Sequence, residues 1–341
     1  MSPAPGQTVA DLGERAAIER VRARLPAPPP WVLVGIGDDA AVIAPARNHL
    51  EVLTTDALVE GIHFDRAYVP PAAIGHKALA ANLSDLAAMG AQPRAALLSL
   101  ILPAALNVAA LDALLDGWLA LATRHDVALI GGNVSRSPGP LVVDVTAVGA
   151  VRPRRALTRG GARPGDDLYV SGSVGGAHAG RLALRQTAAG GAADPWMAVC
   201  EAQFLAPEPR VRLGLLLARN RVATSCVDLS DGLGDAVRQL AMASRVGAIV
   251  EADRLPLPDP ARRWFEEREK LDPVAAAVAG GEDYELLFTV GARRRRALAA
   301  VLRQAGGLPC TRIGTVTAAR ALVLRRAAGT EPLPAGFAHF R

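Results

Sequence analysis

The chain is predicted to be an α+β protein of two domains, and three observations support this prediction. Its 341 residues are many for one hydrophobic core and suit two domains of roughly 150 to 200 residues each. Short apolar segments bounded by glycine, proline or aspartate, which are typical of strands, occur in mixed order with segments of helical periodicity. Acidic residues gather beside glycines where several of these segments end.

The first elements are expected to be one helix followed by short strands. Residues 11–25 have an amphipathic helical pattern, and the prolines that follow between residues 26 and 30 rule out its continuation. Residues 32–36, 41–43 and 51–55 are predicted to be strands. These strands would carry three aspartates to strand ends or turns, namely Asp38, Asp39 and Asp56.

The rest of the first domain alternates helices with strands. Residues 72–89 are predicted to be a helix that buries Leu79, Leu83 and Leu86 and stops at Gly90. The elements predicted after it are a strand, a helix and two further strands, at residues 95–102, 108–125, 128–130 and 141–151.

The second domain is expected to begin near Arg152, because a region of glycine, arginine and proline precedes the next strand at 167–171. We therefore expect domains at residues 1–151 and 152–341. The glycine-rich segment 171–180 leads from this strand into a helix and is able to bind phosphate through its N–H groups. Later strands are predicted at 222–228, 248–251 and 285–290, and helices at 233–244 and from 293–296 onward.

Composition excludes several classes of protein. Hydrophobic residues make up 50% and charged residues 21% of the chain, which excludes a mainly disordered one. The net charge of +5 is spread over scattered arginines without interleaved aromatic residues, so we expect no nucleic-acid partner. No membrane span or secretory leader is predicted. The three cysteines, Cys200, Cys226 and Cys310, form no metal-ligand spacing, so we expect reduced thiols and a cytoplasmic location.

The acidic segments point to a site for Mg²⁺ and a nucleotide. Carboxylates in apolar surroundings are costly unless they are paired or bind a metal, so several converging segments need a shared cation. The metal-binding candidates are Asp39, Asp56, Asp85, Asp228 and Asp231. Oxygens of Thr54 and Thr55 could complete the shell, although β-branched strand packing explains these two residues equally well. Each Asp alone could instead cap a helix or a turn.

Taken in order, these segments resemble those of the thiamine-monophosphate kinase family, which has the aminoimidazole ribonucleotide synthetase-like fold. The first half carries Gly-Ile-Gly-Asp-Asp at 35–39, Thr-Thr-Asp at 54–56, Gly-Ile-His-Phe at 61–64 and Asn-Leu-Ser-Asp-Leu-Ala-Ala-Met-Gly at 82–90. The second half carries Arg-Ala-Leu-Thr-Arg at 155–159, Asp-Leu-Ser-Asp-Gly-Leu at 228–233 and Gly-Gly-Glu-Asp-Tyr-Glu-Leu at 280–286. The match covers nearly the whole chain.

The resemblance implies that ATP phosphorylates thiamine monophosphate to thiamine diphosphate by direct in-line transfer, with several Mg²⁺ ions. It implies an N-terminal α+β domain that binds metal and ATP and packs in a homodimer, and a C-terminal α/β domain. The implied metal ligands are Asp39, Thr54, Thr55, Asp56, Asp85, Asn133, Asp228 and Asp231. The residues implied to bind ATP are Gly132, Asn133, Arg159 and Ser230, and those implied to bind thiamine phosphate are His63, Glu282 and Phe337.

One departure from the family pattern concerns the metal site. Gly131-Gly-Asn133 stands where the family normally has Gly-Gly-Asp. Asparagine keeps an oxygen ligand but loses a charge, so weaker binding is expected at one metal position.

Two alternatives remain open. One is another ATP-dependent enzyme of the same superfamily. It is disfavoured because no reactive Cys or Lys lies in an N-terminal glycine-rich segment, as selenophosphate synthesis would need, and because the motifs at 84–90 and 280–286 look like the thiamine branch. The other is a nucleotide-binding protein that has lost turnover, for which Asn133 is the only argument.

Overall fold

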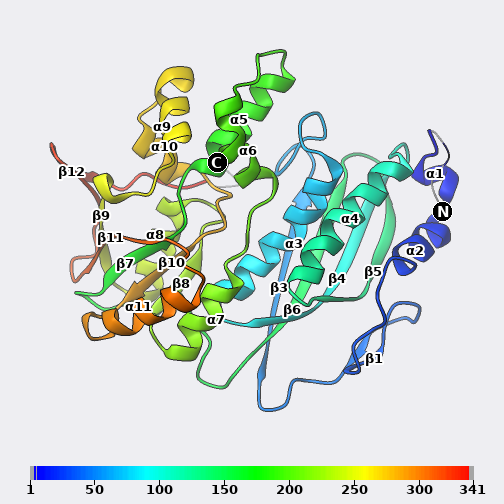
Figure 1. Ribbon diagram of the computed structural model, residues 1–341, viewed down its shortest axis with the longest axis horizontal. Helices are drawn as coiled ribbons and strands as arrows, with labels where there is room; N and C mark the ends of the chain where they lie inside the picture. Colours follow the sequence, from blue (N-terminus) through cyan, green and yellow to red (C-terminus); the bar gives the residue numbers. More distant parts are fainter. Residues whose placement is uncertain (1–3, 5, 338–341) are drawn as a thin grey trace. The chain divides into compact units, whose positions relative to one another are not determined.

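The computed structural model describes residue 4 and residues 6–337 (Figure 1). Contacts between residues in space divide the chain into two compact units. One consists of residues 1–83 and 92–153, and the other of residues 84–91 and 154–341. Each unit combines a sheet with helices, so the predicted mixed α and β content is confirmed. Within the described residues, no helix is long and apolar enough to cross a membrane.

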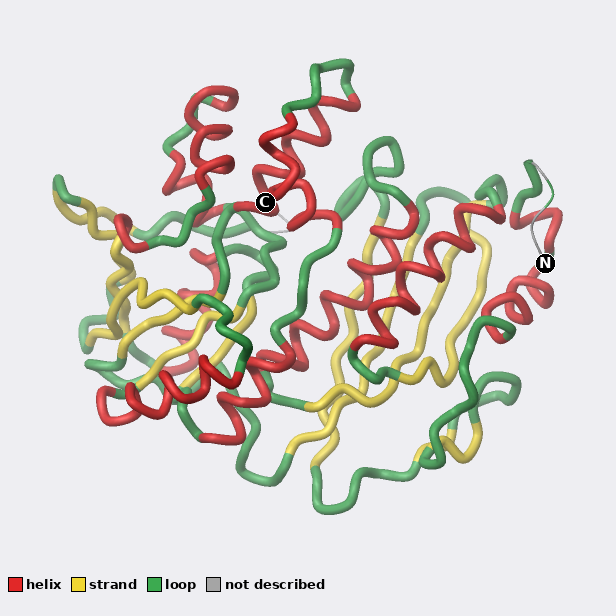
Figure 2. Tube along the Cα trace, in the orientation of Figure 1, coloured by secondary structure: helices red, strands yellow, loops and turns green. Residues whose placement is uncertain are grey.

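The first unit is built on a four-stranded sheet in the order β3-β6-β4-β5. Its strands are β3 (Leu50–Val59), β4 (Gln92–Pro103), β5 (Ala128–Ser137) and β6 (Val142–Val151). β4 and β5 are parallel, whereas β6 is antiparallel to both β3 and β4. Helices α3 (Pro71–Ala88) and α4 (Val108–Arg124) cover one face of this sheet, as Figures 1 and 2 show.

The two faces of this sheet differ in burial. Val143 and Val145 of β6 and Leu100 of β4 are almost fully buried. On the other face, Leu53 of β3 is 69% exposed and Leu97 of β4 is 37% exposed. Because successive side chains of a strand point to opposite faces, one face is the core beneath the helices. The other, called the open face below, is exposed in the single chain around Leu53 and Leu97, whereas its Ala95 and Val148 are buried in a small cluster with Trp31 and Val32.

The N-terminal elements correct one prediction. The helix expected over 11–25 is two helices, α1 (Val9–Leu12) and α2 (Glu14–Arg22). They meet at Gly13, whose φ of 77° interrupts the helical path. Thr8 caps α1 by accepting a hydrogen bond from the Asp11 N–H. The next two strands, β1 (Val32–Val34) and β2 (Val42–Ile43), are shorter than predicted and pair with each other.

Helix α3 follows its prediction closely. Leu79, Leu83 and Leu86 are fully buried, as the periodicity predicts. Gly90 has a φ of 64°, and the N–H groups of Gly90 and Ala91 bond back to the last turn of the helix. The predicted stop at Gly90 is therefore confirmed, with the left-handed residue that commonly ends a helix.

The second unit is built on a seven-stranded sheet in the order β13-β12-β9-β11-β7-β10-β8. Only the β12–β9 pair is parallel among its described neighbours. The strands are β7 (Asp167–Ser171), β8 (Ser225–Asp228), β9 (Gly247–Glu251), β10 (Leu286–Val290), β11 (Cys310–Thr317), β12 (Leu322–Arg326) and β13 (Gly329–Pro332).

Helices of the second unit include several that the hydrophobic pattern did not predict. The α-helices are α5 (Gly176–Ala188), α6 (Ala198–Leu205), α7 (Val211–Asn220), α8 (Leu233–Ser244), α9 (Asp259–Trp264), α10 (Pro273–Ala279) and α11 (Arg295–Gln304). Shorter helical turns lie at Pro195–Met197, Ala252–Arg254, Phe265–Glu269 and Ala292–Arg294. Of these helices, α5, α8 and α11 were predicted.

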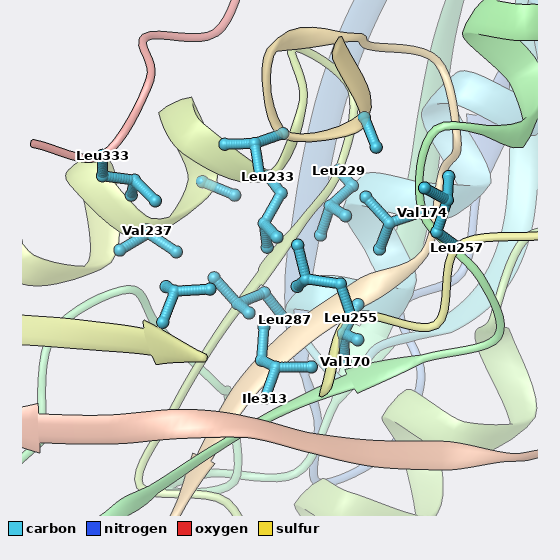
Figure 3. Packing of buried hydrophobic residues seen from close by; sticks show 14 of the residues in the cluster. Val170, Val174, Leu229, Leu233, Val237, Leu255, Leu257, Leu287, Ile313 and Leu333 are labelled. Atoms are coloured by element: carbon cyan, nitrogen blue, oxygen red, sulfur yellow. The ribbon is translucent and has the colours of Figure 1, made fainter. Parts of the chain in front are cut away.

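The core of the second unit lies between its sheet and α8. Figure 3 shows Leu229 and Leu233 packed near Leu287 of β10 and Ile313 of β11, and all four are fully buried. Leu229 belongs to the turn between β8 and α8, so this turn is anchored in the core through an apolar side chain. The polar residues on either side of Leu229 are therefore held on a fixed segment.

Candidate functional site

Three aspartates predicted for strand ends or turns divide into two groups. Asp38 and Asp39 lie in the exposed turn between β1 and β2, as predicted, and the Asp39 N–H donates to the Asp38 carboxylate at 2.9 Å. Asp56 is instead inside β3, which continues four residues beyond the predicted end at Thr55 to Val59. The continuous pairing of β3 with β6 explains the difference, because all ten residues of β3 have a partner there.

The Thr-Thr-Asp segment presents side chains to both faces of the sheet. Thr55 pairs with Thr146 on the open face, whereas Thr54 and Asp56 belong to the face that carries the helices. The Thr55 hydroxyl lies 3.2 Å from an Asp144 carboxylate oxygen, which it can reach as donor. β3 is an edge strand of the sheet, so side chains from both of its faces lie beside its unpaired edge. A metal ion at this edge could therefore be shared by Thr55 on one face and by Thr54 and Asp56 on the other.

His63 lies in a tight turn directly after β3. Its Nδ1 accepts the Val59 N–H at 3.0 Å, so a neutral ring carries its hydrogen on Nε2. The turn is also held from α3, where the buried Lys77 ammonium donates to the His63 carbonyl oxygen at 3.4 Å. The position of His63 is thus fixed from two elements of the first unit.

Gly132 and Asn133 lie inside β5, which was expected to end at Ile130 but extends to Ser137. Gly132 has a φ of 157°, and a Cβ there would lie 1.9 Å from the Leu98 carbonyl oxygen, so only glycine fits. Asn133 is exposed and pairs with Ser99 of β4. Ser99 in turn pairs with Asp144 of β6, which places Asn133, Ser99 and Asp144 in one row on the open face.

In the second unit, Asp228 ends β8, and its carboxylate is almost fully buried. The Ser84 hydroxyl, which is also buried, donates to Asp228 Oδ2 at 2.8 Å. Asp85 is the next residue of α3, so two predicted metal ligands are brought to neighbouring positions by one hydrogen bond. A hydrogen bond to a charged group is shorter and stronger than a neutral one.

The turn after Asp228 is held by main-chain bonds to two other segments. The Leu229 N–H donates to the Glu285 carbonyl at 2.8 Å, and the Glu282 N–H donates to the Ser230 carbonyl at 2.7 Å. The Phe337 N–H donates to the Asp231 carbonyl at 3.0 Å. Ser230, Asp231, Glu282 and Phe337 therefore meet at one turn, although they lie far apart in the sequence. The predicted strand at 222–228 and helix at 233–244 have the ends that the structure shows around this turn, with Asp228 ending β8 and Leu233 beginning α8.

Close backbone packing explains the two glycines before Glu282. A Cβ on Gly281 would lie 2.5 Å from the Ser230 carbonyl oxygen, and a Cβ on Gly280 would lie 2.6 Å from the His178 Cβ. Glu282 itself has a left-handed φ of 72°. This segment is therefore shaped by its contact with the β8–α8 turn.

Phe337 is anchored by its main chain while its side chain stays accessible. Its N–H bonds to Asp231, and the residue is 53% exposed. The residues that follow it, 338–341, lie outside the described part of the chain.

Arg159 is held by its main chain near the far end of α8. Its carbonyl accepts a hydrogen bond from the Ser244 hydroxyl at 3.1 Å, and Ser244 is the last residue of α8. Ser230 precedes the other end of this 12-residue helix, about 18 Å away at 1.5 Å per residue. The contacts of the Arg159 main chain therefore do not join it to the turn that carries Ser230.

The glycine-rich segment before α5 binds a carboxyl group of the chain itself. The N–H groups of Gly175 and Ala177 donate to the Asp283 carboxylate at 2.7 and 3.1 Å. Two of the N–H groups that the sequence analysis considered able to bind phosphate thus bind the Asp283 side chain instead. Burial raises the pKa of Asp283 to about 7, and the two N–H donors partly oppose this rise. Asp283 directly follows Glu282, so it also ties the Glu282 segment to α5.

His178, on the first turn of α5, lies against the same segment. Burial lowers the pKa of His178 to about 4, with a further lowering by Arg181 and an opposing effect of Glu282. Its ring stacks on Phe265 with centroids 5.7 Å apart. His178 is therefore neutral near pH 7.

Neither Asp283 nor Ser84 was predicted as a site residue. Both lie inside the quoted motifs, directly beside Glu282 and Asp85, and that adjacency was the available signal. Among the described residues no group of three or more His, Cys, Asp or Glu side chains is placed to hold a metal ion. Mg²⁺ accepts carboxylate, hydroxyl, amide and carbonyl oxygens as ligands.

Comparison with known proteins agrees with this two-domain arrangement. Models for the N-terminal and the C-terminal domain of AIR synthase related proteins match residues 37–151 and 163–326. A curated thiamine-monophosphate kinase from Synechococcus elongatus is 38% identical over 342 residues, covering 98% of this chain and 98% of that protein. The thiamine-monophosphate kinase from Escherichia coli (strain K12) is 40% identical over 84% of this chain and 85% of its own length.

Solved structures agree as well. The crystal structure of thiamine-monophosphate kinase from Stenotrophomonas maltophilia K279a is 40% identical, with a TM-score of 0.80, and covers 90% of this chain and 95% of that chain. A structure of AaThiL complexed with AMPPCP and TMP is 30% identical, with a TM-score of 0.76, and covers 100% of this chain and 99% of that one. The chain belongs to the thiamine-monophosphate kinase family. The resemblance and the fold inferred from the motifs are thereby confirmed.

Proposed function

We propose that this protein transfers the γ-phosphoryl group of ATP to the phosphate of thiamine monophosphate, forming ADP and thiamine diphosphate, the last step of thiamine diphosphate biosynthesis. The observation that carries the proposal is the β8–α8 turn, where Asp228, Ser230 and Asp231 meet Glu282 and Phe337. These residues are the ones to which the family resemblance assigns metal, ATP and substrate binding. Relatives that match nearly the whole chain are named for this activity.

The residues present fit Mg²⁺. Asp228 offers a nearly buried carboxylate that is oriented by Ser84, and Asp231 follows three residues later on the same turn. Asp39, Thr54, Thr55, Asp56, Asp85 and Asn133 offer further oxygen atoms. When bound, Mg²⁺ neutralises charge on the phosphates and orients them for in-line transfer.

The protein's own part in the reaction is to position two phosphorylated substrates. Ser230 is proposed to bind ATP, together with Arg159, Gly132 and Asn133. No general base is required of the chain, because the acceptor is a phosphate oxygen that is already ionised near pH 7. Positioning and charge neutralisation then account for most of the catalysis.

Thiamine monophosphate is proposed to contact His63, Glu282 and Phe337. The partly exposed Phe337 ring offers a flat aromatic surface for the cationic thiazolium, a contact of the cation–π type. The Glu282 carboxylate, held beside the β8–α8 turn, offers an opposite charge. His63, which is held by Val59 and Lys77, is proposed to contact a polar group of the substrate.

We also propose a homodimer formed through the first domain, residues 1–151. The open face of its sheet exposes Leu53 and Leu97, and exposed apolar side chains on a sheet favour burial against another surface. A second copy of the chain offers the same face, which suits a twofold interface. The proposed compartment is the cytoplasm, in keeping with three free cysteines among the described residues.

A substrate panel tests the proposed reaction against its alternatives. Purified protein with ATP and Mg²⁺ is expected to phosphorylate thiamine monophosphate, but not thiamine, selenide or formylglycinamidine ribonucleotide. Turnover of one of the other substrates alone would support a different enzyme of the superfamily. ATP binding without transfer to any of them would support a nucleotide-binding protein without turnover.

A further inference from the structure

Two residues beside the β8–α8 turn have a backbone conformation that residues other than glycine rarely adopt. Glu282 has a φ of 72° and Tyr284 a φ of 50°, both in the left-handed region. Such residues persist only where the surrounding structure holds them. The Glu282 N–H donates to the Ser230 carbonyl oxygen at 2.7 Å. The Tyr284 N–H donates to the Leu229 carbonyl oxygen at 3.0 Å, so the turn holds one side of this segment.

An ion pair holds the same segment at its C-terminal end. Glu285 directly follows Tyr284, and its carboxylate is almost fully buried. Arg210, the residue before α7, donates from Nε to Glu285 Oε2 at 2.6 Å and from Nη2 to Oε1 at 2.5 Å. The Ser171 hydroxyl at the end of β7 donates to the same Oε2. A bidentate contact between arginine and a carboxylate fixes the orientation of both groups, so Glu285 cannot turn without breaking these bonds.

The surroundings of Glu285 are shaped around its carboxylate. A Cβ on Gly172 would lie 1.8 Å from Glu285 Oε1, so a side chain there would displace it. The Ser171 hydroxyl also accepts the Leu286 N–H at 2.9 Å, which ties it to β10. A buried ion pair is weak evidence of stability, because both charges lose their hydration. The two-point contact therefore favours a role in orienting the segment that ends at Glu285.

We propose that Arg210 is a positioning residue for substrate binding. It acts through Glu285 to hold Glu282 in its left-handed conformation, and so directs the Glu282 carboxylate to the cationic thiazolium of thiamine monophosphate. The proposal rests on the proposed function for the identity of the substrate. In a purely structural role, the ion pair would affect the stability of the second unit but not the affinity for thiamine monophosphate.

Arg210→Lys tests the proposal on the full chain, because lysine keeps the positive charge beside Glu285 but cannot form the two-point contact. Arg312→Lys is the matched control. It makes the same exchange at the buried Asp167 carboxylate of the same sheet, to which Arg312 Nε donates at 2.6 Å. Hydrogen–deuterium exchange without substrate is followed in peptides that cover residues 280–286. We expect exchange there to be roughly tenfold faster in Arg210→Lys and unchanged in Arg312→Lys.

Substrate binding is measured on the same proteins by isothermal titration calorimetry. Arg210→Lys is expected to weaken the binding of thiamine monophosphate about fivefold, because Glu282 is no longer held in its binding position. The affinity for AMPPCP should change less than about twofold, because Leu229 anchors the β8–α8 turn in the core. Arg312→Lys should keep both affinities. Ser171→Ala removes only the third bond to Glu285 and should give smaller changes in the same direction, which keeps the test available if Arg210→Lys does not fold.

The outcomes separate this proposal from the proposed function. Unchanged exchange in Arg210→Lys, an equal increase in Arg312→Lys, or faster exchange with wild-type affinity for thiamine monophosphate would each overturn the role of Arg210. Equal losses of affinity for thiamine monophosphate and AMPPCP would also overturn it, since they would indicate a general loosening of the site. Wild-type protein that binds AMPPCP but no thiamine monophosphate would contradict the proposed function. The exchange measurement alone would then decide whether Arg210 holds the Glu282 segment.

Discussion

Asp283 and His178 are two buried groups whose effects on stability oppose each other, and replacing Asp283 should reveal the effect of His178. Burial raises the pKa of Asp283 from 3.8 to about 7, so the folded protein keeps a proton that the unfolded chain loses. The contribution of Asp283 to stability is therefore present at low pH and is lost as pH rises from about 4 to about 7.

The contribution of His178 to stability changes with pH in the opposite direction. Burial lowers its pKa from 6.5 to about 4, so the folded protein excludes a proton that the unfolded chain binds. Stability from this group is present above about pH 6.5 and is lost as pH falls toward 4. Each group alone changes the free energy of unfolding by about 1.4 kcal/mol per pH unit where it acts fully. In the shared window from about pH 4.5 to 6.5 the two slopes nearly cancel.

The Asp283→Asn variant removes the pH dependence of stability that is due to Asp283 and leaves the one that is due to His178. Its free energy of unfolding is expected to rise with pH between 4.5 and 6.5, by roughly 2 to 3 kcal/mol in total, whereas the wild type changes little. Asparagine accepts only one of the two N–H bonds from Gly175 and Ala177, which lowers stability by about 1 to 2 kcal/mol at every pH. The informative result is the changed pH dependence of the free energy of unfolding, and not the loss of stability that is the same at every pH.

Urea unfolding followed by tryptophan fluorescence provides the measurement. Replacing Trp31 and Trp118 by phenylalanine in all proteins leaves Trp196 and Trp264 to report on the second unit, where their rings lie 6.2 Å apart. His178→Asn is the complementary variant and should show stability falling with pH over the same window. If Asp283→Asn kept the pH slope of the wild type, the assignment of the buried proton to Asp283 would be wrong.

Two further predictions concern the hydrogen bond at Asp228 and the open sheet face. Ser84→Ala removes the donor to Asp228 Oδ2 and should lower the urea stability of the second unit by about 1.5 to 3 kcal/mol. It should also raise the Mg²⁺ concentration needed for half-maximal rate, and an unchanged Mg²⁺ dependence would separate Ser84 from the metal site. Leu53→Glu should convert the proposed dimer to a monomer in sedimentation velocity, because it places a charge on the open face. The same substitution at Leu271, which is 49% exposed in the second unit, should leave the dimer intact, and a dimer that survives Leu53→Glu contradicts the proposed interface.

Local signals predicted individual elements well. The limits of α8 and β7 agree with the sequence pattern residue for residue, because α8 follows a glycine with a φ of 94° and β7 is flanked by turn residues. The break at Gly13 and the length of β3 were missed, since amphipathic periodicity passed over one glycine and the pairing of β3 with β6 is a long-range contact. The order of the seven-stranded sheet depends on such contacts throughout and was not predictable from spacing.

In the candidate site, too, local sequence signals predicted some residues, whereas others depend on long-range contacts. The gathering of acidic residues beside glycines was enough to nominate Asp228 and Asp231. Roles for Ser230, Glu282 and Phe337 came from the family resemblance, and main-chain bonds bring these three residues to one turn in the structure. The row that Asn133 forms with Ser99 and Asp144, in contrast, depends on strand register across β5, β4 and β6, which no local pattern reveals.

The central claim is that this chain transfers phosphate from ATP to thiamine monophosphate through a metal site that includes Asp85. The most direct test follows thiamine diphosphate formation by phosphorus NMR with ATP, Mg²⁺ and purified protein, alongside Asp85→Asn. We expect the wild type to produce ADP and thiamine diphosphate in equal amounts and the variant to lose most of this activity while remaining folded. Folded wild-type protein that binds ATP but forms no thiamine diphosphate would contradict the claim.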